Sequence, residues 1–311
     1  MSKRNLKADR DTYNWQEALG QFLWWKQAGG VSKRTLEDYE RYIKGFFKYY
    51  PQAFVNSENL KNAVYEYMSK PAKPAYYNLK LVYLKAFFQW CVNEGYLSEN
   101  PLSDFKRRRA EGKIINIDND TIKELISLPD KKTFAGLRDY SLILLTLDTG
   151  IRPSESFSLL IPDVNFKGLE IYVRSDYAKT RISRTLPICV ITAKAIHDLI
   201  SVRHPSWDDS VPLFCTVEGK RMNRFTWEDR LNKYSKKLGV KITPYALRHV
   251  FALTFLRNGG NVFALQRILG HSDLTMTKKY IALLNQDIKE QHLNASPLNV
   301  LVPKKVRIRK I

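Results

Sequence analysis

The sequence predicts a mainly α protein with a small antiparallel β-sheet, organised as two domains. The chain has 311 residues, whereas a single domain usually has about 150. Apolar residues recur at helical spacing through the first hundred residues and again after residue 120. Residues 169–174 and 184–189 instead alternate or are rich in β-formers, which indicates strands.

Four helices are predicted in the first hundred residues. Apolar positions from Trp15 to Leu23 form the first, and the second follows Ser32, a suitable N-cap, and ends before Pro51. The third and fourth are predicted at about 57–69 and 75–93. We expect a small all-helical domain over residues 11–100. Its polar faces are expected to carry Lys33, Arg34, Arg41, Lys44, Lys48, Lys80 and Lys85.

Residues 101–115 are predicted to link the two domains because they have no apolar periodicity. The segment contains four consecutive cations, Lys106, Arg107, Arg108 and Arg109. Such a linker can lie along a phosphate backbone, or it can be a hinge that charge repulsion holds open.

The second domain is predicted over residues 116–295, followed by a basic tail at 296–311. It opens with helices at about 120–127 and 134–148, and a hairpin follows in which a polar tip, 175–183, joins the two strands. Further helices are predicted at about 193–202, 224–238, 244–258, 262–269 and 274–287.

The composition narrows the classes of function. Lys and Arg total 51 against 31 Asp and Glu, which gives a net charge of +20, while 44% of the residues are hydrophobic. This excludes a disordered basic tail and an acidic solvating protein. A folded protein with such an excess attracts polyanions, of which nucleic acid is the most abundant, although a basic enzyme without a nucleic-acid partner has the same composition.

Several signals are missing from the sequence. Cys91, Cys189 and Cys215 are far apart and odd in number, so they form neither a disulfide framework nor a zinc ribbon. The chain shows no apolar signal region, no apolar run long enough to span a membrane and no glycine-rich nucleotide loop. We therefore expect a cytoplasmic protein in which nucleotide-driven chemistry has no visible seat.

Three segments carry candidate functional residues. TGIRPSE, 149–155, places Arg152 at a junction between helices, where its guanidinium is held in place. In ITPYALRH, 242–249, Thr243 caps a helix, and Tyr245 and Arg248 share a face near the N-terminus, where backbone N–H groups favour an anion. LGHSD, 269–273, holds His271 at a turn before the helix that carries Tyr280.

Together with a lysine in the hairpin, these motifs resemble those of the tyrosine recombinases, the family of phage integrases and Xer-type resolvases. The resemblance covers nearly the whole chain. It implies that residues 11–100, with their exit NEGYLSENP, form a SAM-like core-binding domain. It implies a catalytic domain over 116–295.

The resemblance assigns a role to each matching residue. It implies that Arg152 and Arg248 clamp the scissile phosphate and that Tyr280 is the nucleophile. Lys179 matches the general acid, although Arg181 and Arg184 share the hairpin tip and a shift in register would exchange them. The remaining matches are His271, which contacts a phosphate oxygen, and Glu155, which supports the first arginine.

Position 245 departs from the family, most of which has a histidine where this chain has Tyr245. A phenol is a poor general base at neutral pH, so the residue that takes the proton from Tyr280 stays open. We expect Tyr245 to hydrogen-bond the phosphate or the nucleophile. His249 is expected to be a supporting hydrogen-bonding group rather than a catalyst.

These residue types suit the chemistry of strand cleavage. Attack of a phenolate on a phosphodiester adds negative charge to the non-bridging oxygens, which two fixed arginines stabilise more in the transition state than in the ground state. We expect the same arginines to lower the pKa of the phenol. The phosphotyrosine ester retains the bond energy, so religation requires neither ATP nor a metal.

The resemblance implies a site-specific recombinase of a mobile genetic element that acts on double-stranded DNA with paired recombination sites. It further implies a nucleoid-associated protein that needs no cofactor and no metal. It also implies a homotetramer in which the C-terminal tail docks on a neighbouring subunit. Two alternatives remain, a type IB topoisomerase and a DNA-binding architectural protein that has lost the reaction.

Overall fold

The fold is mainly helical with one small antiparallel sheet, as the sequence predicts. The structure, a computed structural model, describes residues 14–109, 117–176, 182–274, 277, 280, 292–293 and 296–301. The chain divides into two compact units, residues 1–112 and 113–311, and the division falls within the predicted linker. Within the described part of the chain, no helix has both the length and the apolar character needed to cross a membrane.

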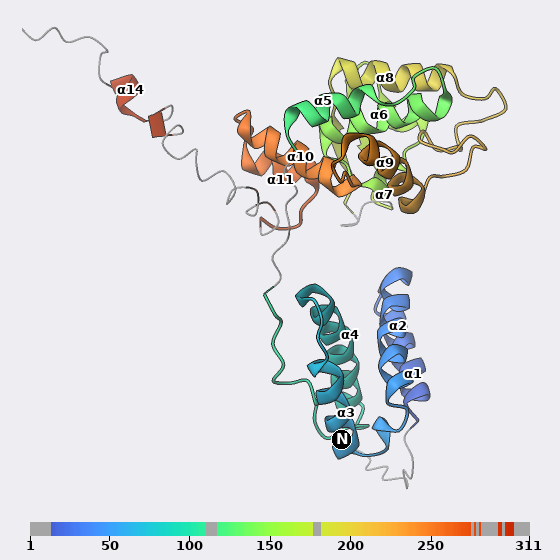
Figure 1. Ribbon diagram of the computed structural model, residues 1–311, viewed down its shortest axis with the longest axis vertical. Helices are drawn as coiled ribbons and strands as arrows, with labels where there is room; N and C mark the ends of the chain where they lie inside the picture. Colours follow the sequence, from blue (N-terminus) through green and yellow to red (C-terminus); the bar gives the residue numbers. More distant parts are fainter. Residues whose placement is uncertain are drawn as a thin grey trace, which may run out of the picture. The chain divides into compact units, whose positions relative to one another are not determined.

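The first unit contains α1 (Trp15–Ala28), α2 (Lys33–Tyr49), α3 (Ser57–Ser69) and α4 (Pro74–Asn93), with a short 3-10 turn, η1 (Ala53–Val55), before α3 (Figure 1). Side chains of Asn14, Ser32 and Asn56 cap the first three helices, and Pro74 opens the fourth. The buried core between the helices is rich in aromatic rings, among them Phe22, Phe46, Phe47, Phe87 and Phe88.

Lys80 corrects one expectation about this unit, because it lies in the core rather than on a polar face. Its side chain is 3% exposed, and Nζ donates a hydrogen bond of 3.1 Å to the carbonyl of Tyr67. The ammonium also lies 4.3 Å from the centre of the Tyr67 ring. Helical periodicity cannot distinguish such a buried, partnered lysine from an exposed one.

The linker is attached to α4 over the part that the structure describes. Asn78 exchanges two hydrogen bonds of 2.8 Å with the backbone of Arg108, whose guanidinium lies 3.7 Å from the centre of the Tyr77 ring. Lys106, Arg107 and Arg109 are exposed. Residues 105–109 are therefore held on the first unit rather than forming an unattached hinge.

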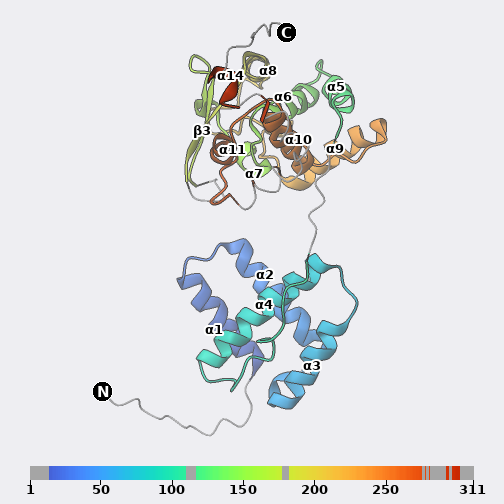
Figure 2. The ribbon, with the colours of Figure 1, turned by 90° about the vertical axis from the view of Figure 1, so that its left-hand side faces the viewer.

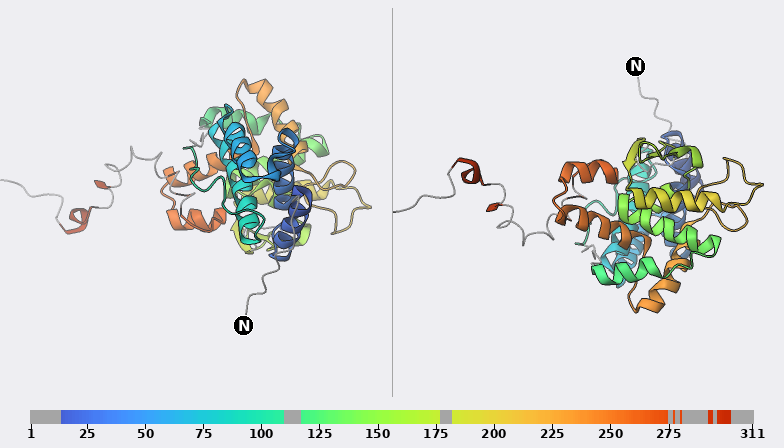
Figure 3. Two further views of the ribbon diagram at one scale, coloured as in Figure 1. Left: turned by 90° about the horizontal axis from the view of Figure 1, so that it is seen from below. Right: turned by 90° about the horizontal axis from the view of Figure 1, so that it is seen from above.

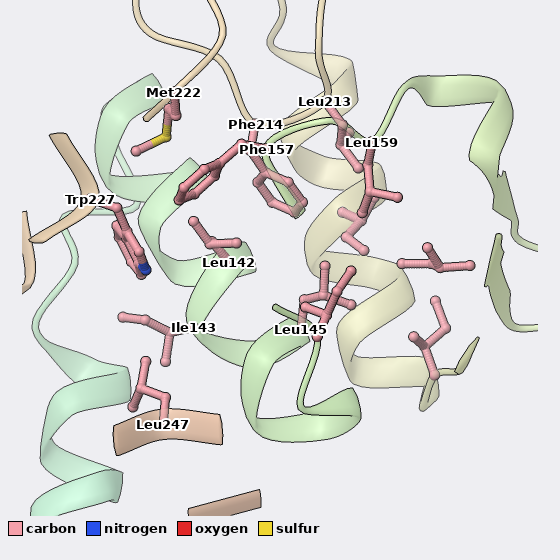
Figure 4. Packing of buried hydrophobic residues seen from close by; sticks show 14 of the residues in the cluster. Leu142, Ile143, Leu145, Phe157, Leu159, Leu213, Phe214, Met222, Trp227 and Leu247 are labelled. Carbon is pink, nitrogen blue, oxygen red and sulfur yellow. The ribbon is translucent and has the colours of Figure 1, made fainter. Parts of the chain in front are cut away.

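The second unit is built around α6 (Phe134–Thr149), which packs against α8 (Val190–Ser201) and α10 (Pro244–Arg257). Figure 3 shows α6 and α8 side by side. α5 (Asn119–Ser127) packs against α9 (Arg224–Leu238) and α6. Large apolar side chains, including Leu142, Phe214 and Trp227, fill the space between these helices (Figure 4).

The sheet has the strand order β1 (Val164–Asn165), β2 (Glu170–Val173) and β3 (Arg184–Pro187), and both pairs are antiparallel. Ile171 and Leu186 pair across β2 and β3 and point into the core, as the predicted hairpin requires. The sequence missed β1, because two residues are too short to show alternation. β3 lies beside α11 (Val262–Leu269) (Figure 2).

The remaining elements are short or only partly described. The 3-10 turn η2 (Ile161–Asp163) precedes the sheet, and α14 (Leu298–Leu301) lies in the predicted tail. Of the helix predicted at 274–287, the structure describes Leu274, Thr277 and Tyr280, the last two as helical.

Candidate active site

The first segment of the site is the turn between α6 and α7 (Pro153–Ser156). Gly150 ends α6 with a φ of +61°, a left-handed conformation that glycine adopts without strain. A Cβ on this glycine would collide with the Phe251 ring and lie 2.7 Å from the Leu269 side chain. Glycine therefore lets this turn approach α10 and α11 closely, and Arg152 follows two residues later.

Glu155 joins two arginines from different parts of the chain. The backbone N–H and Nη1 of Arg152 each donate a hydrogen bond of 3.1 Å to its carboxylate. Arg184, at the start of β3, donates from Nη1 at 3.1 Å and from Nη2 at 2.6 Å. Burial by itself would raise the pKa of Glu155, but the hydrogen bonds and charge of Arg184 and the charge of Arg152 hold it below its ordinary value.

Arg248 connects the turn at 150 to the turn at 269–271. It lies on α10, is 4% exposed, and donates from Nη1 to the carbonyl of Gly150 and from Nη2 to that of Leu269 at 2.8 Å. Arg152 donates from Nη2 to the carbonyl of Gly270 at 2.8 Å. Both arginines thus tie together turns that are more than one hundred residues apart in the sequence.

The charge of this cluster is poorly neutralised. Burial, followed by the charge of Arg152, lowers the pKa of Arg248 to about 9, so its guanidinium stays protonated at neutral pH. Arg248 makes no ion pair with any residue that the structure describes. Among the described residues, three guanidinium groups, those of Arg152, Arg184 and Arg248, lie around one buried carboxylate, that of Glu155.

His271 is neutral in this setting. Burial, followed by the charges of Arg248 and Arg152, lowers its pKa to about 4. Nη2 of Arg248 lies 3.2 Å from Nε2, and because a guanidinium only donates, Nε2 must accept. Nδ1 then carries the proton and donates to Oγ1 of Thr277 at 2.9 Å.

Tyr280 is buried beside this cluster. Its side chain is 4% exposed and packs in an apolar cluster that includes Phe251 and Leu265. Its hydroxyl lies 2.7 Å from Nδ1 of His249. Burial raises the pKa of the phenol, and the opposing effect of Arg248 is smaller. Arg248 does lower this pKa, as expected of the arginines, but burial has the larger effect and the net pKa is raised.

Tyr245 and the candidate general acids were also expected in the site. Tyr245 is 46% exposed at the start of α10, with the Arg224 guanidinium 5.8 Å from the centre of its ring. Lys179 and its alternative Arg181 lie outside the described residues. Arg184, the second alternative, is engaged with Glu155 and donates from Nε to the carbonyl of Ile268 at 3.0 Å.

Two contacts of the site were missed by sequence reasoning. Arg184 was considered only as a substitute for Lys179, and no local motif marks it as the second partner of Glu155. His249 was expected to play a supporting role, yet it contacts the Tyr280 hydroxyl directly. The sequence signal for this contact was the position of His249 next to Arg248 on α10. Adjacent helical residues project about 100° apart, so they can reach different groups of one site.

Comparison with known proteins identifies the family of the chain. The model of the phage integrase family matches residues 116–287. Tyrosine recombinase XerA of Pyrococcus horikoshii is 31% identical over 290 residues, which are 88% of this chain and 92% of that protein. Tyrosine recombinase XerC of Thermodesulfovibrio yellowstonii is 29% identical over 283 residues, 87% of this chain and 92% of that protein.

Solved structures share the fold. The Tn1549 transposon integrase in complex with a circular intermediate DNA superposes with a TM-score of 0.70 at 21% identity, covering 86% of this chain and 95% of that one. A lambda integrase dimer bound to a COC' core site superposes with a TM-score of 0.67 at 16% identity, covering 84% of this chain and 96% of that one. The resemblance drawn from the motifs is confirmed, and the chain belongs to the phage integrase family as a tyrosine recombinase of the Xer type.

Proposed function

We propose that this chain is a site-specific DNA recombinase that cleaves and rejoins strands through a covalent 3′-phosphotyrosyl intermediate on Tyr280. One observation carries the proposal. Among the described residues, Arg152, Arg184 and Arg248 supply three positive charges around the buried carboxylate of Glu155, next to a buried phenol. A phosphodiester is the ligand whose charge such a cluster neutralises.

The proposed reaction is an exchange of esters at phosphorus. The Tyr280 phenol gives up its proton to a general base, its oxygen forms a bond to phosphorus, and the bond from phosphorus to the 5′ oxygen breaks. The 5′ oxygen takes a proton from the general acid proposed by resemblance, Lys179. Arg152 and Arg248 stabilise the charge that develops on the non-bridging oxygens. Attack by a 5′-hydroxyl on the phosphotyrosine reverses these bond changes and rejoins the strands.

The wider context is proposed from the relatives. We propose that the protein acts in the cytoplasm on paired sites in double-stranded DNA, including those of a mobile genetic element, and that four copies assemble on the DNA. The lambda integrase forms a tetramer on a Holliday junction, which supports this arrangement by analogy. The tail at 296–311 is the segment proposed to dock on a neighbouring copy. Lys106, Arg107, Arg108 and Arg109 are proposed to contact the phosphate backbone.

A suicide duplex tests the central proposal. This probe is a nicked duplex built from paired inverted repeats in the DNA beside the gene; the nick lets the cleaved fragment diffuse away, which traps the enzyme on the DNA. The parent chain should form a covalent adduct that survives denaturation, and Tyr280→Phe should form none. Binding without any adduct would favour an architectural protein, and relaxation of a plasmid without the repeats would favour a topoisomerase.

A further inference from the structure

The hydrogen bond between His249 and Tyr280 identifies a partner for the nucleophile. The two rings lie 5.6 Å apart between centres, and Nδ1 is 2.7 Å from the phenol oxygen. Burial raises the pKa of Tyr280, so the phenol carries its proton at neutral pH. A buried hydroxyl proton requires an acceptor, and among the described residues Nδ1 of His249 is placed to accept it.

The surroundings of His249 suit a group that takes up and releases a proton. The His249 side chain is half-buried, whereas the Tyr280 side chain is buried. A neutral imidazole has one ring nitrogen that accepts a hydrogen bond, and that nitrogen can take up a proton. Since His249 directly follows Arg248 on α10, the acceptor and one arm of the proposed phosphate clamp are positioned by the same turn of helix.

The other candidate acceptors of the site are less suited to take the proton of Tyr280. Arg248 only donates, and Nε2 of His271 already accepts from Arg248. Tyr245 is itself a phenol, is 46% exposed and lies beside Arg224. It precedes His249 by four residues, about one helical turn. A histidine one turn further along α10 can therefore supply the function that Tyr245 cannot.

We propose that His249 is a catalytic residue that accepts the proton of Tyr280 during strand cleavage. The inference rests on the proposed function. The O–H bond of Tyr280 breaks as its proton moves to Nδ1, the phenol oxygen bonds to phosphorus, and the 5′ oxygen leaves with a proton from the general acid. During religation the 5′-hydroxyl gives its proton back to the general acid as its oxygen attacks phosphorus, and His249 returns its proton to the departing Tyr280 oxygen.

Single-turnover cleavage of the suicide duplex by three proteins tests this role. His249→Ala removes both the hydrogen bond and the acceptor, and we expect its rate to fall by about 10²–10⁴, the range of general base catalysis. His249→Asn keeps a polar atom near the position of Nδ1 but cannot take the proton, so a comparable loss is expected. His204→Ala is the matched control, because His204 is exposed and hydrogen-bonds Ser206, and it should cleave at the parent rate.

Two further measurements separate proton transfer from positioning and from general acid catalysis. Free imidazole should raise the rate of His249→Ala at least tenfold, because it occupies the vacated space and accepts the proton. A duplex with sulfur in place of the 5′ oxygen has a leaving group that needs no protonation, since a thiol has an ordinary pKa of about 8.5. If His249 acts on Tyr280 and not on the leaving group, the sulfur duplex will not rescue the variant. The ratio of the His249→Ala rate to the parent rate should then be the same on both duplexes.

The outcomes distinguish this inference from the proposed function. If the parent chain forms no adduct at all, the proposed function fails. If the parent forms the adduct and Tyr280→Phe does not, the proposed function is supported. Cleavage by His249→Ala or His249→Asn at the parent rate would then overturn only the inference about His249. Rescue of His249→Ala by the sulfur duplex, or a failure of imidazole to raise its rate while duplex affinity and melting temperature match the parent, also overturns it.

Discussion

Glu155 illustrates how a single side chain organises the site. Its carboxylate is 1% exposed and holds Arg152 from one turn and Arg184 from the sheet. A buried carboxylate is costly without partners, and here both oxygens receive guanidinium N–H groups. The arrangement keeps the proposed phosphate clamp in place before DNA arrives, which lowers the cost of reorganisation during the reaction.

Substitution of Arg248 is expected to separate binding from cleavage. Arg248→Lys keeps the charge but cannot donate to Gly150, Leu269 and His271 together. We expect single-turnover cleavage to fall by about 10²–10³, the usual cost of losing one such donor. Affinity for the duplex should change by less than tenfold, because Arg248 is one of 51 cations. Parallel losses of affinity and rate in a gel-shift and a cleavage assay would contradict the clamp.

The pH dependence of stability should report on His271. Its pKa is about 4 in the folded chain and about 6.5 in an unfolded one. Between these values the unfolded chain binds a proton that the folded chain does not, so the free energy of unfolding falls as the pH drops through this window. Thermal unfolding measured from pH 7 to pH 4 should show a smaller loss of stability for His271→Asn than for the parent. Equal losses would mean that His271 takes up a proton equally well in both states.

At the scale of elements, the site depends on how closely α6, α10 and α11 approach one another. Gly150 ends α6 and Gly270 ends α11, both with a φ of +61°, and the carbonyls of these two turns accept from Arg248 and Arg152. The helix ends therefore supply acceptors that hold the arginines, while the guanidinium groups satisfy carbonyls that a helix end leaves unpaired.

Gly150→Ala should be far more destabilising than a matched glycine substitution. The alanine would be strained at a φ of +61° and would collide with Phe251 and Leu269, which together cost about 2–5 kcal/mol. Gly239 ends α9 with a φ of +66°, but a Cβ added there would meet no atom within 4 Å. Gly239→Ala should therefore lower the free energy of unfolding by about 1–2 kcal/mol, through backbone strain alone. Chemical denaturation of the two variants measures the difference. Equal costs would show that α10 and α11 do not pack tightly against this turn.

At the scale of the whole molecule, charge governs the encounter with DNA. A net charge of +20 attracts any duplex but identifies no sequence. The linker contributes to this charge in a defined geometry, since Arg108 stacks on Tyr77 and its backbone is bound by Asn78. The neighbouring cations Lys106, Arg107 and Arg109 are exposed on this attached segment.

The proposed contacts of the linker can be counted by their salt dependence. Arg107→Ala/Arg109→Ala should reduce the slope of log affinity against log salt by about 0.9 for each phosphate that the variant no longer neutralises. Lys123→Ala/Lys131→Ala removes the same charge from α5 and the loop after it, and its slope should match the parent. Affinity titrations over a range of salt concentrations provide both slopes. Equal slopes for the two double variants would show that only overall charge matters.

Local patterns along the chain suffice to predict the longer helices, the hairpin strands β2 and β3, and the motif residues; the short helix α14 was not predicted. These features depend on neighbours in the chain: apolar spacing predicts α2 and α4, Thr243 and Pro244 mark the start of α10, and Gly150 and Gly270 mark helix ends. The family could be recognised because its motifs keep their order along the chain.

Which of these residues touch is set by the folded arrangement alone. The second partner of Glu155 is Arg184, 29 residues away, and the partner of the Tyr280 hydroxyl is His249, 31 residues away. Burial likewise raises the pKa of Tyr280 although arginines lie nearby, and the packing of the first unit places Lys80 in the core. Contacts, desolvation and charge depend on distances in space, which local spacing along a chain does not specify.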